Sequence, residues 1–338
     1  MVSSSHNFLF SALRIAGFAS ALLALLFVIN NFLIFGIGAP GVIHTIGLAD
    51  MFGVATPKDG YSGSLMTVGF VQTAAAAIAV GFAIYHTIST ANLRQDAAFM
   101  DRTSAYIVRL AFWAVLMVGL VDATLSFLRV EDFHKILFGE AGGAAIALPS
   151  DRGLYVHIPL ILFAGLIALK EKSVSLVWLT LLVVIAEFLI VVARFIYGYE
   201  QTFMGDLVRF WYAALFLFAS AYTLKEDGHV RVDVLYAGLT RRTKSILNVI
   251  GTVFFGIPLC WLILVRGMWG KSSLINSPMM NFETSMSGFG MYVKYLMAAF
   301  LVVFALSMIF QFTSYLFQSL ADIEDKIVDE DASEEVAQ

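Results

Sequence analysis

The sequence has few charged residues and few of the residue types that most enzymes use for chemistry. Charged side chains make up 14% of the 338 residues, the net charge is −4, and there are six histidines and one cysteine. A soluble domain carries roughly a quarter charged residues, so this composition excludes a soluble globular chain. It also excludes a nucleic-acid partner, which would require a basic surface. The lone Cys260 excludes a disulfide framework and a cysteine-based metal cluster.

Motifs for catalysis are equally scarce. The sequence has no nucleophile elbow, no phosphate-binding glycine loop and no Walker motif. His86 and His157 lie near opposite ends of their predicted helices, whereas a haem or metal ion needs ligands at one depth. His134 follows two acidic residues in a predicted outer loop, which favours a solvated side chain over a metal ligand. We therefore predict that the chain is not an enzyme and holds no metal and no cofactor.

Long apolar runs dominate what is present. Apolar residues make up 59% of the chain, thirty residues are Phe, and the mean hydropathy is +0.83. A helix needs about 20 residues to cross a bilayer, and several charge-free runs are that long or longer. A transmembrane barrel would instead alternate apolar and polar residues. The sequence predicts an all-α polytopic membrane protein with about eight transmembrane helices: 12–36, 64–90, 104–128, 152–170, 174–197, 205–224, 245–268 and 291–318.

Charge placement predicts the topology. Lys and Arg are densest in 225–244, and the predicted inner loops and flanks hold twelve of the 21 Lys and Arg against five in the outer loops, which favours N-inside and C-inside. The first apolar run is too long for a signal-peptide core, so we expect a retained helix. The segment 322–338 is rich in acidic residues and reads as a disordered cytoplasmic tail.

Two acidic residues lie inside predicted spans. Asp122 falls in the outer half of the third span, and Glu187 in the middle of the fifth. Intramembrane acids are functional candidates, which opens a role in proton or ion transport. The favoured interpretation is structural pairing, because Glu187 and Arg194 lie seven residues apart on one helix face.

Two other features concern helix packing. Gly69, Thr73, Ala77 and Gly81 form a small-residue stripe in the second span that allows a close helix neighbour, by default within this chain. Pro258 is expected to kink the seventh span.

The most distinctive segment follows the sixth span. Gly228 is placed to end the helix, and three valines then alternate with polar residues, so that Arg231 and Asp233 point the same way if the segment is extended. This is more order than a basic loop on the inner side requires. The motif residues of this inner loop are Glu226, Gly228, His229, Arg231 and Asp233.

This run resembles the small membrane subunit, of DctQ type, of tripartite ATP-independent periplasmic (TRAP) transporters. The family run Ala-Tyr-x-Leu-(Lys/Arg)-Glu-x-Gly-His-(Ile/Val)-Arg-Val-Asp-Val-Leu is filled in order by 221–235. Arg194 fits the family's outer-end arginine, while Phe203 and Asp206 stand where the family has Trp and Glu. Tyr292 fits the aromatic that opens the last helix. The resemblance implies a four-helix domain at 171–321, preceded by an N-terminal extension at 1–170.

The resemblance further implies the function. A periplasmic binding protein would deliver an organic acid to a large membrane subunit, which would carry it into the cell with sodium. This chain would be the small subunit in the bacterial inner membrane, scaffolding the large one and contacting lipids. Arg194 and Asp206, at the outer face, would pair with each other or meet the binding protein.

Two other functions remain open. One is a self-contained, proton-coupled secondary transporter that uses Asp122 and Glu187. The other is a membrane subunit of an oxidoreductase, which the mismatched depths of His86 and His157 disfavour.

Overall fold

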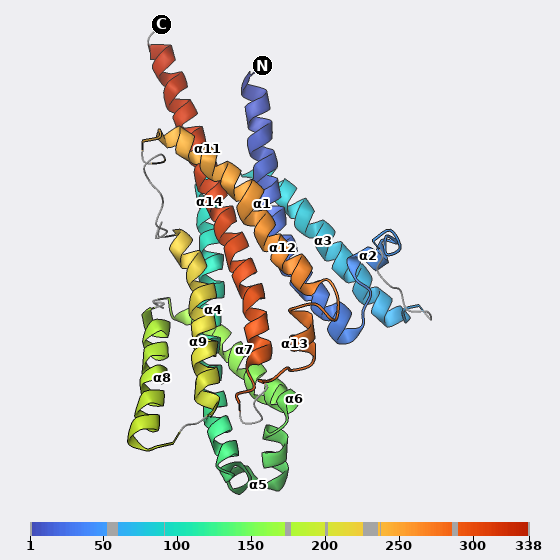
Figure 1. Ribbon diagram of the computed structural model, residues 1–338. Coiled ribbons are helices and arrows are strands. Elements are labelled where there is room, and N and C mark those ends of the chain that lie inside the picture. Colours follow the sequence, from blue (N-terminus) through green and yellow to red (C-terminus); the bar gives the residue numbers. More distant parts are fainter. Residues whose placement is uncertain are drawn as a thin grey trace. The chain divides into compact units, whose positions relative to one another are not determined.

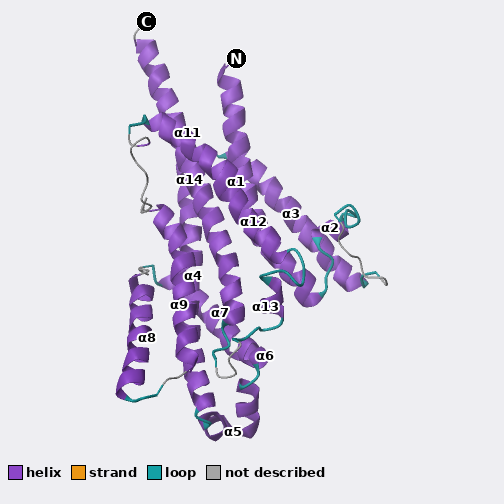
Figure 2. Ribbon diagram, viewed as in Figure 1, coloured by secondary structure: helices purple, strands orange, loops and turns teal. Residues whose placement is uncertain are grey.

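The computed structural model describes residues 2–52, 60–90, 92–172, 177–199, 202–225, 236, 238–285 and 290–336. Every regular element in these ranges is helical (Figure 2), which confirms the all-α prediction. The elements are α1 Val2–Phe32, η1 Leu33–Ile37, α2 Val42–Thr45, α3 Gly63–Ser89, α4 Leu93–Val130, α5 Phe133–Ile146, α6 Pro149–Arg152, η2 Gly153–His157, α7 Ile158–Lys170, α8 Val177–Ile196, α9 Thr202–Lys225, α11 Arg241–Gly251, η3 Thr252–Gly256, α12 Ile257–Met268, α13 Asn276–Met280 and α14 Lys294–Val336.

The described part of the chain contains eight helical stretches long and apolar enough to cross a membrane, as predicted. They are Phe8–Ile37, Gly63–Ser89, Leu93–Val130, Pro149–Lys170, Val177–Ile196, Phe203–Leu224, Arg241–Met268 and Lys294–Asp325. The third starts well before residue 104, where the sequence predicted it. Its early turns contain Arg94 and Asp96, whose charges are matched by partners on other helices.

Two prolines coincide with irregular helix turns inside these stretches. The π-helical turn η2 ends two residues before Pro159, and η3 ends two residues before Pro258. Proline cannot donate a backbone hydrogen bond, and its ring clashes with the carbonyl four residues earlier. A wider π turn at that point relieves the clash and keeps the helix continuous. The predicted effect of Pro258 is therefore expressed as the π turn η3.

The residues cluster into two compact units, each with segments from both sides of residue 170. The first unit comprises Met1–Thr103, Asp227–Val265 and Met308–Gln338. Within it, α1 runs along α3 (Figure 1). The indole of Trp261 on α12 donates a 2.8 Å hydrogen bond to Ser20 of α1, and the rings of Phe18 and Phe317 lie 5.0 Å apart. Helices before residue 170 thus pack directly on helices after it.

The second unit comprises Ser104–Glu226 and Arg266–Ser307. Its apolar core is built from the inner faces of α4, α9 and the start of α14, and α8 pairs with α9 (Figure 1). Gly119 allows the close approach of Trp211, because a Cβ at Gly119 would lie 2.5 Å from the indole nitrogen. That indole donates to the carbonyl of Val115 at 3.3 Å. Core residues include Phe112, Val118, Leu207, Phe210, Phe218 and Phe300.

Two predicted loops differ from the structure. The segment 129–152, predicted as an outer loop, contains α5 and α6. Gly139, in the left-handed region at φ 71°, and Asp132, at φ 56°, bend it into a helical hairpin. The segment from 322, predicted as a disordered tail, continues α14 to Val336. Extending an existing helix avoids the cost of nucleation, and Glu and Ala are good helix formers, so the acidic composition does not end the helix.

Candidate functional site

A buried charge network surrounds Asp122 in the second unit. The Asp122 side chain is fully buried, as are those of Arg152 and His157. Arg152 Nη1 donates to Asp122 Oδ1 at 3.0 Å, and His157 Nε2 lies 3.0 Å from the same oxygen. The backbone N–H of Tyr292 donates to Oδ2 at 2.9 Å. Both carboxylate oxygens are therefore engaged, by groups from two separate segments, the α6–η2 turn and the segment before α14.

The local sequence explains how these groups meet. Pro149 starts α6, where its missing N–H costs nothing, and the short helix places Arg152 at its end. Gly153 follows, and a Cβ there would lie 2.4 Å from the Phe282 ring, so only glycine allows this close approach. On α4, Ser126 is one turn after Asp122 and accepts a 3.2 Å bond from Arg152.

Two tyrosines at the start of α14 complete the network. The Tyr292 ring faces the guanidinium carbons of Arg129 at 4.4 Å and of Arg152 at 4.3 Å. Its hydroxyl accepts from Arg129 and donates to the carbonyl of Ala147 at 2.9 Å. The hydroxyl of Tyr295 lies 2.7 Å from His157 Nδ1. Since a carboxylate only accepts, His157 donates from Nε2 to Asp122, and a ring protonated there alone accepts from the Tyr295 hydroxyl at Nδ1.

The charges of this network do not cancel. Asp122 supplies one negative charge, while Arg129 and Arg152 supply two positive ones. Nη2 of Arg152 is buried and has no hydrogen-bond partner in the described part of the chain. The faces of the Tyr292 ring offset part of this excess through cation–π attraction. The network links α4 and the α6–η2 turn to the start of α14, and we call it the Asp122 brace.

A second buried network lies in the first unit. Arg14 of α1 binds Asp96 of α4 through Nε at 2.7 Å and through Nη2. The other Asp96 oxygen lies 2.9 Å from Nε2 of His86 on α3. Arg14 also donates to the carbonyl and the hydroxyl of Thr90. Both charged side chains are buried, so this network fixes three helices of the N-terminal extension together.

Exposed ion pairs join the extension to the C-terminal helix in the same unit. Arg94 of α4 bonds Asp325 at 2.5 Å and Asp322 at 3.0 Å, and Arg241 bonds Asp322 at 2.9 Å. Asp322 and Asp325 belong to the segment that the sequence predicted to be a solvated tail. The acidic residues at its start are instead matched by basic residues at the beginnings of α4 and α11.

The predicted site residues fall in different surroundings. The inner-loop motif, with Glu226, Gly228, His229, Arg231 and Asp233, lies outside the described residues. Asp206 is buried near the start of α9, where it accepts from the backbone N–H of Met291 at 3.1 Å and from Arg209 and Ser285 at 3.3 Å. Its described partners thus lie on α9 and in the segment before α14. Arg194, its expected partner, is exposed on α8.

The two intramembrane acids also differ from each other. Asp122 is paired with Arg152 and His157. Glu187 is exposed on α8 and has no hydrogen bond or ion pair with any described residue, so the proposed bond to Arg194 is not formed. Two further histidines among the described residues are engaged or buried. His86 binds Asp96, and His134, expected in a solvated loop, is 6% exposed on α5.

The small-residue stripe is only partly used for packing. Gly69 is buried against Pro40 and Thr45, whereas Ala77 and Gly81 are exposed and Thr73 is partly buried. A four-residue step advances about 40° around a helix, so the stripe turns away from its neighbour over three steps. The buried face of α3 instead follows Gln72, Ala79, Ala83 and Thr87.

Sequence reasoning missed most of the Asp122 network. It identified Asp122 and Tyr292, but not Arg129, Arg152 or His157 as partners. The signal was present in part. Asp122 lies in the second half of the third span, Leu93–Val130, and Arg152 near the start of the fourth, so an antiparallel pair brings them to one end. No group of three or more His, Cys, Asp or Glu in the described residues is arranged to hold a metal ion.

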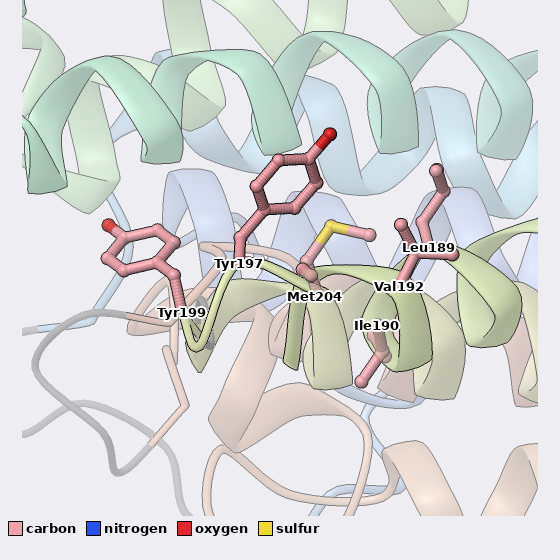
Figure 3. Close-up of a pocket in the computed structure, with 7 residues that line it drawn as sticks. Leu189, Ile190, Val192, Tyr197, Tyr199 and Met204 are labelled. Carbon is pink, nitrogen blue, oxygen red and sulfur yellow. The ribbon is translucent and has the colours of Figure 1, made fainter. Parts of the chain in front are cut away.

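A shallow hollow of about 250 Å³ opens between α8 and α9 (Figure 3). Leu189, Ile190 and Val192 line it from α8, and Met204 from α9. The rings of Tyr197 and Tyr199 stand at its end, and the Tyr199 hydroxyl binds the Glu131 carboxylate. This lining suits hydrocarbon, and it offers no cationic group for an organic acid.

Comparison with known proteins finds a family match for most of the second half of the chain. Residues 175–321 match the family model described as "Tripartite ATP-independent periplasmic transporters, DctQ component". No curated protein and no solved structure matches the chain. The matched range begins at α8 and ends within α14, and it contains four of the eight apolar stretches. The similarity to the DctQ component of TRAP transporters therefore covers residues 175–321, fewer than half of the 338 residues.

Proposed function

We propose that this chain is the small membrane subunit of a sodium-coupled TRAP transporter, and that it scaffolds the large membrane subunit. The large subunit would carry an organic acid delivered by a periplasmic binding protein. The observation that carries this proposal is the DctQ match over residues 175–321. The inner membrane of a bacterium is the proposed location, with both termini inside, as the basic residues in 225–244 favour.

The state of the two intramembrane acids supports a scaffold over a self-contained transporter. A carboxylate that relays protons or binds a coupling ion needs access to water or to the ion. Asp122 has no exposed surface and both of its oxygens are bonded. Glu187 lies on the outer surface of a different helix, α8. The two acids thus do not share one polar pathway.

We further propose that the extension stiffens the DctQ helices. In the first unit Ser20 of α1 bonds Trp261, and Ala97 of α4 accepts a 2.8 Å bond from Ser314. In the second unit Asp122 and His157 engage the start of α14. Each contact joins a helix before residue 170 to one after it. A scaffold gains from such bracing, because its partner moves against it.

Co-purification and transport test the proposal together. The chain is expressed with its neighbouring operon products, captured through a C-terminal tag in mild detergent, and reconstituted in liposomes with the captured partner. We expect a second, larger multi-span protein to copurify, and substrate uptake to require both proteins, the binding protein and a sodium gradient. Uptake by this chain alone, driven by protons, would instead establish the self-contained transporter.

The proposed topology has its own measurement. A green fluorescent protein fused after Gln338 should fluoresce, because that reporter folds when it remains in the cytoplasm. An alkaline phosphatase fusion at the same place should be inactive. The opposite pair of results would reverse the predicted orientation.

A further inference from the structure

Helix α8 exposes most of its surface. Its buried residues are Leu179 and Ala186, which face α9, its one extensive helix contact among the described elements (Figure 1). Nearly every exposed position is apolar, as expected for a helix in a membrane. Three positions are polar: Thr180, Glu187 and Arg194.

These three residues lie on one line along the helix. They are spaced seven residues apart, and seven steps of about 100° fall about 20° short of two full turns. Glu187 occupies the middle of the span Val177–Ile196, at the depth where a charge costs most. Glu187 is exposed and has no hydrogen bond or ion pair with a described residue.

An acid in this position is unstable if lipid covers it. Ionisable side chains within membrane spans almost always face other protein or a water-filled cavity. No described residue of this chain supplies that environment for Glu187. The rest of the exposed face, with Val184 at 57% and Val191 at 49% exposure, offers apolar packing on either side of the acid.

We infer that the Thr180–Glu187–Arg194 face of α8 contacts a transmembrane helix of the large membrane subunit, which presents a basic or hydrogen-bond-donating side chain to Glu187. This inference rests on the proposed function and identifies its contact surface. A polar stripe repeating every seven residues matches left-handed helix pairing, with a crossing angle near +20°.

A second copy of this chain fits the face poorly. Two parallel copies that met through this face would place Glu187 beside Glu187. Like charges in a low-dielectric setting repel strongly. The large subunit, a different sequence, can supply a basic or hydrogen-bond-donating group opposite Glu187, so charge complementarity favours it.

Site-specific photocrosslinking in the assembled complex tests the face. p-Benzoylphenylalanine replaces Val184, which lies about 60° around the helix from Glu187, or Ile185, which lies about 160° away at the same depth. Both side chains are exposed, at 57% and 44%, so they form a matched pair. We expect a crosslink to the tagged large subunit from position 184, several times stronger than from position 185. Equal crosslinking, a crosslink within this chain, or a crosslink to a second copy would overturn the inference.

Substitutions then test the charge. Glu187→Leu suits lipid better than the acid does, so it is harmless if lipid covers the face. If the inference holds, Glu187→Leu lowers the recovery of the large subunit about threefold to tenfold, and Glu187→Gln lowers this recovery less. Ile185→Leu, about 160° around the helix from Glu187, is the control, and it should leave recovery unchanged. Normal recovery with Glu187→Leu would overturn the inference.

The two proposals fail differently. If the wild-type chain does not retain the large subunit in any mild detergent, the proposed function itself is wrong. If the wild-type chain retains it, but neither the position 184 crosslink nor Glu187→Leu has the expected effect, only the assignment of this face is wrong.

Discussion

Two regions of this chain contain one intramembrane acid each, and they treat it in opposite ways. Around Asp122 on α4, the α6–η2 turn supplies Arg152 and His157, the segment before α14 supplies the backbone N–H of Tyr292, and no surface remains exposed. Around Glu187, α8 supplies only apolar neighbours, and the carboxylate is exposed. Asp122 finds all its bonding partners within the chain. Glu187 gains partners only if another protein covers it. This difference is the one expected between an acid that stabilises the fold and an acid at a protein interface.

The largest loss of stability is expected on substitution of Asp122, whose bonding partners lie within the chain. Asp122→Ala leaves Arg152 and His157 buried without their counter-charge, and breaking a buried ion pair costs about 3–5 kcal/mol. We expect the chain purified in detergent to unfold at a clearly lower temperature, measured by the loss of its monodisperse peak after heating. Glu187→Ala is the matched comparison and should leave that temperature nearly unchanged. If the Asp122→Ala chain were as stable as the wild type, the Asp122 network would not stabilise the fold.

The network in the other unit predicts a slightly smaller loss. Arg14→Ala removes the guanidinium group that links three helices, but Asp96 keeps its contact with His86. We expect a loss of about 3 kcal/mol, the lower end for a broken buried pair. Arg102→Ala is the control, because Arg102 is exposed on the same helix as Asp96. Heat-induced loss of the monodisperse peak serves again, and equal effects of the two substitutions would contradict a specific role for Arg14.

A smaller effect separates the ring of Tyr292 from its hydroxyl. Tyr292→Phe keeps the aromatic face between Arg129 and Arg152, but it removes the bonds to Ala147 and Arg129. Loss of such hydrogen bonds costs about 1–2 kcal/mol. Tyr155→Phe, at a residue that is 71% exposed, provides the control. Urea unfolding in mild detergent, followed by tryptophan fluorescence, compares the two variants, and a silent Tyr292→Phe would mean that the ring alone carries the contact.

The membrane architecture could be predicted because it depends on local composition. Apolar length and the scarcity of charge determine that a segment spans, and all eight spans follow from that rule. The start of the third span could not be predicted, since Arg94 and Asp96 look like loop residues until their partners on α14 and α1 are known. The hairpin of α5 was missed for a related reason, because its small and apolar residues also suit a loop.

The candidate site could be predicted only in part. Asp122 stands out in sequence because any acid in an apolar run does. Its partners Arg152 and His157 do not, because they lie near a span boundary, where charged residues are common. The small-residue stripe was predicted to pack along its whole length, but regular spacing in sequence does not show which face of a helix meets a neighbour. Gly69 packs and Gly81 does not, and the crossing of α3 with its neighbours decides that.

The smallest effect is expected at the exposed acid when the chain is alone. Glu187→Leu removes a side chain that has no described partner, and substitutions at exposed positions usually change stability by less than about 0.5 kcal/mol. In the chain purified without the large subunit, we expect the unfolding temperature to match the wild type within error, while the same substitution lowers recovery of the complex. That combination is the signature of an interface residue, since an internal brace would lose stability in both settings. If Glu187→Leu destabilised the isolated chain as much as Asp122→Ala does, Glu187 would belong to an internal contact, and the contrast between the two acids would disappear.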